Sequence, residues 1–116
     1  MPQRVEAGWV ERRLEEGEVT LLAVLPKEAY EKAHLPGSVP VPAEEAELAR
    51  TVEELVPDRL ATVVVYGEGP ESPAVGRAAR TLEALGYRRV FEFKSGVEGW
   101  RRTGHVVESG DAAAAA

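Results

Sequence analysis

The amino-acid sequence predicts an α/β domain with a central, mostly parallel sheet of about five strands and helices on both faces. Segments with helical periodicity alternate with apolar segments along the chain. Two apolar segments, residues 18–25 and 61–66, lack the polar alternation of a half-exposed strand, which indicates burial on both faces. Such strands, separated by helices, are typical of a parallel sheet covered on both sides.

Helices and strands can be placed along most of the chain. We predict helices over residues 7–17, 26–34, 43–56, 73–86 and 96–104. We predict strands over residues 18–25, 61–66 and 88–93, and a short strand within residues 35–42 after a turn. The prolines of this last segment indicate a strand end or a sheet edge.

The first three helices have recognisable ends or faces. Val10 and Leu14 share a face of the first helix, which Gly17 ends. Pro26 suits the first position of the second helix. The third helix has acidic residues in its first turn, which suit the helix dipole. Its apolar face is formed by Leu48, Val52, Leu55 and Val56.

The later elements follow the same pattern. In the helix over residues 73–86, Gly86 provides the left-handed C-terminal stop. The inward-facing residues of this helix are predicted to be Val75, Ala78, Ala79, Leu82 and Leu85. The strand over residues 88–93 and a short final helix follow, and no internal repeat is visible.

The composition excludes several classes of protein. Hydrophobic residues make up 44% and charged residues 29%, which is typical of a globular domain. A formal net charge of -6 makes nucleic acid a poor partner, since phosphate backbones are bound by basic surfaces. No apolar run approaches the roughly 20 residues that span a bilayer. No signal peptide is visible, so we expect a cytoplasmic protein without membrane contact.

The chain contains no cysteine. This excludes disulfides, thiolate metal ligands and thiol nucleophiles supplied by this chain. Asn is also absent, Gln3 is the only Gln, and Glu and Arg dominate the charged residues. Avoidance of labile side chains together with many charges indicates a thermophilic source.

The most informative segment joins the strand over residues 61–66 to the helix that follows it. In open α/β sheets, ligands bind at the carboxyl ends of strands, where this loop lies. Ser72 before Pro73 favours a helix start with the hydroxyl as N-cap. Free N–H groups and the helix dipole then outline an anion site. The loop consists of Gly67, Glu68, Gly69, Pro70, Glu71 and Ser72.

Two interpretations of this loop need no family relationship. Gly-x-Gly after a strand is a weak signal for a dinucleotide site, and Ser72 stands where the third glycine should be. A phosphate-binding loop would need Gly-Lys-Ser/Thr, which is absent. Alternatively, Gly67 and Gly69 are only turn glycines at positive φ, and Ser72 only caps the helix.

A third interpretation rests on resemblance. The run LLAVLPKEAYEKAHLPGSVPVP closely resembles the first signature of the rhodanese family, with its His-hydrophobic-Pro-Gly-small turn at residues 34–38. The second half resembles the family in its strand, loop, AARTLEALGY helix, Trp100 and closing Gly104. The resemblance covers roughly residues 5–107. It implies a rhodanese-like domain over residues 1–110 and a low-complexity tail over 111–116.

The resemblance also exposes departures from active members. At the position of Gly67 these carry a cysteine, whose thiolate holds sulfur as a persulfide, and some relatives have a second cysteine where Ser72 stands. The first strand has Ala23-Val24-Leu25 in place of the usual Asp-x-Arg. Glu68 and Glu71 stand in a loop that often carries an arginine. Each carboxylate opposes an anion by about 1 kcal/mol, so together the two can cancel a helix-terminus contribution of about 0.3–1 kcal/mol.

We therefore expect no sulfurtransferase activity, no catalytic residue and no cofactor. The predicted function is a binding or regulatory module that presents the remnant loop to a partner protein or small ligand. Glu68 and Glu71 favour a basic or amine-bearing partner. The alternative is an enzyme, either a sulfurtransferase accessory that uses a thiol from another chain or ligand, or a hydrolase based on Ser72.

The remaining candidates have simpler interpretations. His34 is either catalytic or, as the resemblance implies, a turn histidine that bonds the backbone. His34 and His105 lack other ligands at metal-binding spacing, so we expect no metal site. Trp9 and Trp100 are predicted to pack rather than to form a binding cage.

Overall fold

The computed structural model describes residues 2–110, so the predicted tail lies outside the described residues. Within them, parallel strands form one five-stranded sheet in the order β1-β5-β4-β2-β3. The strands are β1 (Gln3–Arg4), β2 (Thr20–Ala23), β3 (Val39–Pro40), β4 (Thr62–Tyr66) and β5 (Arg89–Phe93). The helices are α1 (Ala7–Glu16), α2 (Lys27–Lys32), α3 (Glu45–Leu55), α4 (Pro73–Ala84) and α5 (Gly96–Arg102).

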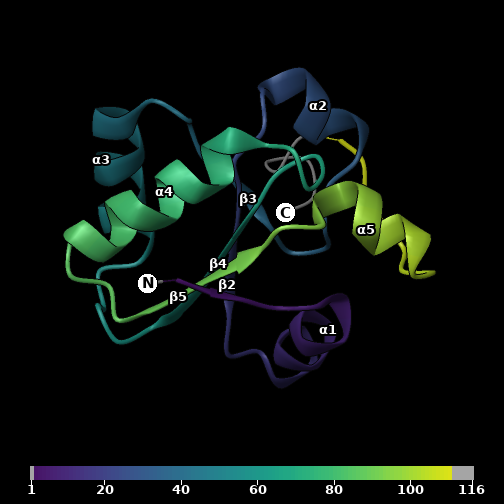
Figure 1. Cartoon of the computed structure of the whole chain (residues 1–116), viewed down its shortest axis with the longest axis horizontal. Coiled ribbons are helices and arrows are strands. Elements are labelled where there is room, and N and C mark those ends of the chain that lie inside the picture. Colours follow the sequence, from purple (N-terminus) through teal and green to yellow (C-terminus); the bar gives the residue numbers. More distant parts are fainter. Residues whose placement is uncertain (1, 111–116) are drawn as a thin grey trace.

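The sheet separates two hydrophobic cores. Alternation along β4 places Val63 and Val65 in one core and Val64 and Tyr66 in the other. The first core is covered by α3 and α4, and the second by α1, α2 and α5. Figure 1 shows α3 and α4 on one side of the sheet and α1 on the other. The predicted α/β fold with helices on both faces is confirmed.

The predicted helix faces are largely confirmed, with one error. Leu55 belongs to the predicted apolar face of α3 but is 45% exposed. The reason is that α3 ends at this residue, and Val56 turns inward with its carbonyl accepting a hydrogen bond from the Tyr87 hydroxyl at 2.5 Å. Gly17 and Gly86 have positive φ, as predicted for helix stops.

Strand β1 was not predicted. It consists of two exposed residues that pair with β5, Gln3 opposite Phe91 and Arg4 opposite Glu92. Two residues carry no periodicity, so only the pairing defines this strand. Among residues 2–110, no helix has the length and apolarity needed to cross a membrane.

Candidate functional site

The loop over residues 67–72 lies where predicted, between β4 and α4 at the carboxyl edge of the sheet. A pocket of about 720 Å³ lies beside it. Its walls come from the end of β2, from the segment after β3, from the loop and from α5. The apolar part of the lining includes Val24, Leu25, Pro42, Ala43, Pro70 and Ala74.

The charged lining of this pocket is mostly acidic. Glu68 and Glu71 line it as expected, and α5 adds Glu98, which sequence reasoning missed. Lys27 is the one cation among the described lining residues. Glu98 is remote in sequence from the loop, so only the folded topology brings it to the site. Three carboxylates around an apolar floor favour a cation over an anion.

Backbone hydrogen bonds hold the loop against α5. The Gly67 carbonyl accepts from the Val97 N–H at 3.0 Å, and the Glu68 carbonyl accepts from the Glu98 N–H at 2.9 Å. These bonds use donors at the start of α5, and they fix Glu98 beside Gly69. The loop's shape is therefore determined by its packing on a second helix.

The interpretation of the loop glycines as positive-φ turn residues is wrong. Gly67 and Gly69 are not among the glycines with positive φ. They are buried, and what each lacks is room for a side chain. A Cβ on Gly67 would lie 2.8 Å from Ser72 Oγ and 3.0 Å from Val75 Cγ2. A Cβ on Gly69 would overlap the Glu98 carboxylate.

Ser72 precedes α4 as predicted, with Pro73 beginning the helix, but its hydroxyl makes no capping hydrogen bond. The side chain instead lies over Gly67. The Ser72 side chain therefore occupies the space that the Cβ of a cysteine at position 67 would need. Ser72 Oγ forms no hydrogen bond to His34 or any other described residue, so no Ser-His pair is assembled.

The loop also retains features of an anion site. The N–H groups of Glu68, Gly69 and Glu71 make no hydrogen bond to another described residue. Free N–H groups before a helix attract anions, whereas the carboxylates around the same pocket repel them. The free N–H groups and the carboxylates therefore have opposite effects on anion binding at this site.

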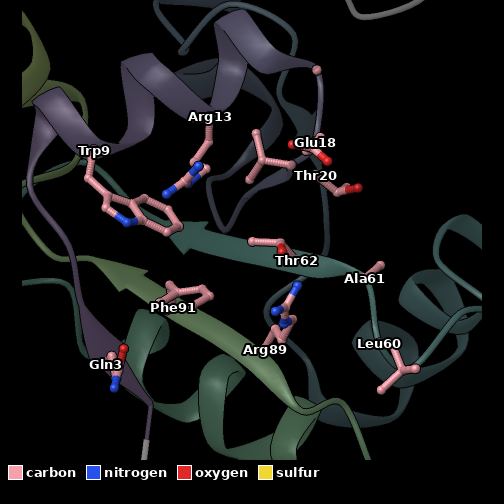
Figure 2. Close-up of a pocket in the computed structure, with 12 residues that line it drawn as sticks. Gln3, Trp9, Arg13, Glu18, Thr20, Leu60, Ala61, Thr62, Arg89 and Phe91 are labelled. Atoms are coloured by element: carbon pink, nitrogen blue, oxygen red, sulfur yellow. The ribbon is translucent and has the colours of Figure 1, made fainter.

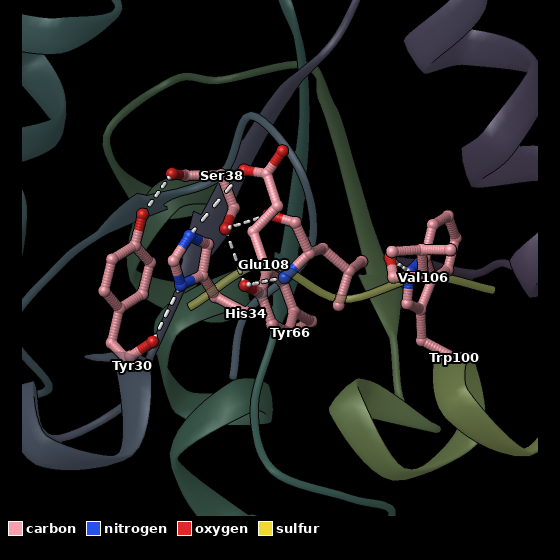
Figure 3. A network of polar contacts seen from close by, with 8 residues as sticks. Tyr30, His34, Ser38, Tyr66, Trp100, Val106 and Glu108 are labelled. Carbon is pink, nitrogen blue, oxygen red and sulfur yellow. Dashed lines mark hydrogen bonds and ion pairs between the residues drawn. The ribbon is translucent and has the colours of Figure 1, made fainter. Parts of the chain in front are cut away.

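A buried polar network lies around Tyr66, the last residue of β4 before the loop (Figure 3). His34 Nδ1 donates to the Tyr30 carbonyl at 2.7 Å, and the two rings stack with centroids 3.8 Å apart. The prediction of a turn histidine that bonds the backbone is confirmed. His34 is 2% exposed and is not among the residues that line the pocket beside the loop.

Tyr66 is the centre of this network, and the sequence analysis did not identify it. Its hydroxyl accepts the Leu35 N–H at 3.0 Å and lies 2.7 Å from Ser38 Oγ. Burial raises the pKa of the Tyr66 phenol well above its ordinary value. Because Tyr66 precedes Gly67, the network fixes the point at which the loop leaves the sheet.

The two tryptophans pack within the fold. Trp100 is buried and donates to the Val106 carbonyl at 2.9 Å, which confirms its packing role. Trp9 packs on Phe91 with ring centroids 4.8 Å apart. Within residues 2–110, no group of three or more His, Cys, Asp or Glu could hold a metal ion.

Comparison with known proteins identifies the fold family. The family model of the rhodanese-like domain matches residues 6–103. The chain belongs to the rhodanese-like domain family. It lacks the cysteine that the family resemblance assigns to the position of Gly67.

One curated relative is larger than this chain. An HTH-type transcriptional regulator, Rv0324 of Mycobacterium tuberculosis, is 38% identical over 99 residues. The match covers 85% of this chain but only 42% of the regulator. The chain therefore spans less than half the length of this relative.

Solved structures agree with the fold. The rhodanese-like domain of the Alr3790 protein from Anabaena is 26% identical with a TM-score of 0.78, over 94% of this chain and 80% of that one. Thiosulfate sulfurtransferase from Pseudomonas aeruginosa is 28% identical with a TM-score of 0.82, over 95% of this chain and 21% of that one.

Proposed function

We propose that this domain is a non-catalytic binding module whose ligand site is the pocket beside residues 67–72. The observation that carries the proposal is the replacement of a sulfur-bearing centre by Gly67, with Ser72 filling the space above it. A pocket of about 720 Å³ nevertheless remains, with an apolar floor. Its size is in the range of ligand pockets.

The charge of the pocket indicates the class of ligand. Glu68, Glu71 and Glu98 outnumber Lys27 in the lining. An ammonium or guanidinium group on an apolar stem matches both the apolar and the acidic lining of the pocket. The stem covers the apolar residues while the cation approaches the carboxylates. A lysine or arginine side chain of a partner protein, or a small aliphatic amine, has this chemistry. The likeness to a transcriptional regulator supports a regulatory use of the pocket.

Titration with n-butylammonium tests the proposal. We expect amide NMR shifts in residues 67–72 and at Glu98, and about tenfold weaker binding in the Glu68→Gln/Glu71→Gln variant. The charge-matched control is Glu15→Gln/Glu54→Gln, which changes two exposed carboxylates on α1 and α3. Equal binding by both variants, or stronger binding of butyrate than of butylammonium, would contradict the proposal.

A second candidate function rests on the likeness to thiosulfate sulfurtransferase. In this alternative, the domain assists sulfur transfer to a thiol that another molecule supplies. Incubation of the chain with thiosulfate and glutathione tests it, with release of sulfite as the readout. Sulfite release that depends on the chain would favour this alternative over the binding module.

A further inference from the structure

A second cleft lies at the opposite edge of the sheet, at the amino ends of β2, β4 and β5. Its volume is about 740 Å³, which is within the range of small-molecule sites. Trp9 and Arg13 of α1 form one side, and Arg89 and Phe91 of β5 form the other. Figure 2 shows these side chains facing one another, with Thr62 of β4 between them. The pocket beside residues 67–72 shares no lining residue with this cleft.

The aromatic part of the cleft is already arranged for stacking. The rings of Trp9 and Phe91 are tilted by 42°, with centroids 4.8 Å apart. Both residues are only partly buried, so ring surface remains open to the cleft. A planar ring that enters the cleft can extend this aromatic pair, and such contacts favour aromatic ligands over aliphatic ones.

The polar part of the cleft is cationic and has unused donors. The Arg89 guanidinium forms no hydrogen bond or ion pair with another described residue. Arg13 pairs with Glu16 and lies over the Trp9 ring, with its guanidinium carbon 5.1 Å from the ring centroid. The hydroxyls of Thr20 and Thr62 also have no partner among the described residues. Glu18 is the only carboxylate among the described lining residues.

Strand register places the free cation beside one of these hydroxyls. Thr62 and Arg89 are paired on adjacent parallel strands. Neighbouring strands lie about 4.8 Å apart, so a single carboxylate can reach both side chains. Figure 2 shows the Arg89 guanidinium directed toward Thr62. A guanidinium binds a carboxylate through two parallel hydrogen bonds, which fixes the orientation of the ligand as well as its charge.

We propose that this cleft binds a small aromatic carboxylate. Its ring stacks on Trp9 and Phe91, and its carboxylate is held by Arg89 with the Thr62 hydroxyl. This cleft therefore prefers an anionic ligand, whereas the pocket beside residues 67–72, which is lined by three glutamates, prefers a cationic one. The two sites therefore select different ligands, and each can be tested without the other.

Titration with 2-naphthoate, followed by NMR, tests this proposal. The chain has two tryptophans, so Trp100→Phe assigns the indole N–H signals. We expect the Trp9 indole signal and the amides of Thr62 and Arg89 to shift, while the Trp100 indole does not. The neutral probe 2-naphthol and the ring-free probe acetate should bind about tenfold more weakly than 2-naphthoate.

Variants identify the cation responsible. Arg89→Gln should weaken 2-naphthoate binding about tenfold, whereas the control Arg77→Gln, on the exposed face of α4, should not. If Arg89→Gln fails to fold, Arg89→Lys serves instead, because it keeps the charge but loses the paired donors. Unchanged affinity in the folded Arg89 variant, equal binding of 2-naphthol, or shifts confined to residues 67–72 would overturn the proposal.

Discussion

Gly96 lies directly against the backbone of the site loop. It has φ of +63°, and a Cβ there would overlap the Gly67 carbonyl oxygen and lie 2.9 Å from the Gly69 nitrogen. Gly96→Ala should therefore lower the free energy of unfolding by about 3 kcal/mol, from backbone strain and overpacking together. Urea denaturation measures this loss.

Gly104 provides the matched control for this prediction. It also has positive φ, at +85°, but a Cβ there would meet nothing within 4 Å. Gly104→Ala should therefore show only the conformational cost, about 1 kcal/mol. An equal loss in the two variants would mean that the approach of the loop backbone to Gly96 places no constraint on the fold.

Burial of the Tyr66 phenol should make the free energy of unfolding fall as the pH rises above 10. Tyr66→Phe leaves the Leu35 N–H without its acceptor, so at pH 7 it should lower stability by about 2 kcal/mol. Burial raises the folded-state pKa of Tyr66 above its ordinary value of 10.0. The wild-type chain therefore loses up to about 1.4 kcal/mol per pH unit above pH 10, because only its unfolded state ionises readily.

The phenylalanine variant has no phenol at this position to ionise. The difference in stability between wild type and Tyr66→Phe should therefore narrow between pH 10 and pH 11, and denaturation at several pH values measures it. A difference that stays constant over this range would show that Tyr66 ionises equally easily in the folded and unfolded chains.

Residue-level prediction succeeded where one side chain and its own turn decide the outcome. His34 bonds the Tyr30 carbonyl of its own segment, as the turn motif implied. Tyr66 and Glu98 were missed because their roles depend on segments remote in sequence. Tyr66 meets the turn containing Leu35, and Glu98 reaches the loop only through α5 packing.

At the scale of elements, α3 and α4 begin in different ways. The Glu44 carboxylate accepts the N–H groups of Ala46 and Glu47 at 2.9 and 3.1 Å, whereas Ser72 caps nothing with its side chain. Glu44→Ala should cost about 1 kcal/mol of stability, and Ser72→Ala less than about 0.5 kcal/mol. Urea midpoints compare the two variants directly. A larger loss for Ser72→Ala would show that its hydroxyl caps α4 in solution.

Elements with several turns or several buried residues were predictable from sequence. Within residues 2–110, the helices and the strands β2, β4 and β5 lie within the predicted ranges. Apolar residues recur along one face of α1, α3 and α4, and continuous apolar runs mark β2 and β4. β1 has no such signal, and Leu55 follows the periodicity of α3 but lies where the helix ends. Chain ends and helix ends depend on tertiary contacts that periodicity does not encode.

For the whole molecule, the composition predicts high thermal stability. The chain has no Asn or Cys, and its Arg side chains also join elements. Arg59 bonds the Leu85 carbonyl at 3.0 Å, the Tyr87 hydroxyl at 3.1 Å and Glu53 at 2.6 Å. We expect a Tm above about 65 °C, beyond the usual mesophilic range. Calorimetry that places Tm at about 45–65 °C would reject the inference of a thermophilic source.

At the scale of the whole molecule, the surroundings of residue 67 determine whether a cysteine at that position can restore sulfur transfer. Gly67→Cys alone should give no thiosulfate–cyanide activity, because Ser72 and Val75 occupy the space of its side chain. Gly67→Cys/Ser72→Gly relieves the closest contact but leaves the glutamates around the pocket. These raise the pKa of an introduced thiol and repel thiosulfate, and the net charge of -6 adds to the repulsion.

Thiosulfate–cyanide activity should therefore appear only when the negative charges of the loop are removed and space is made for the cysteine side chain in the same variant. We expect thiocyanate formation from Gly67→Cys/Ser72→Gly combined with Glu68→Gln/Glu71→Gln, and not when it is combined with the charge-matched changes Glu15→Gln/Glu54→Gln. Equal thiocyanate formation, detectable in both combinations, would show that the acidic lining does not oppose an anionic donor. It would also remove the electrostatic basis for assigning this pocket a cationic ligand. Activity in the single Gly67→Cys variant would show that the loop never lost its capacity to hold a sulfur donor.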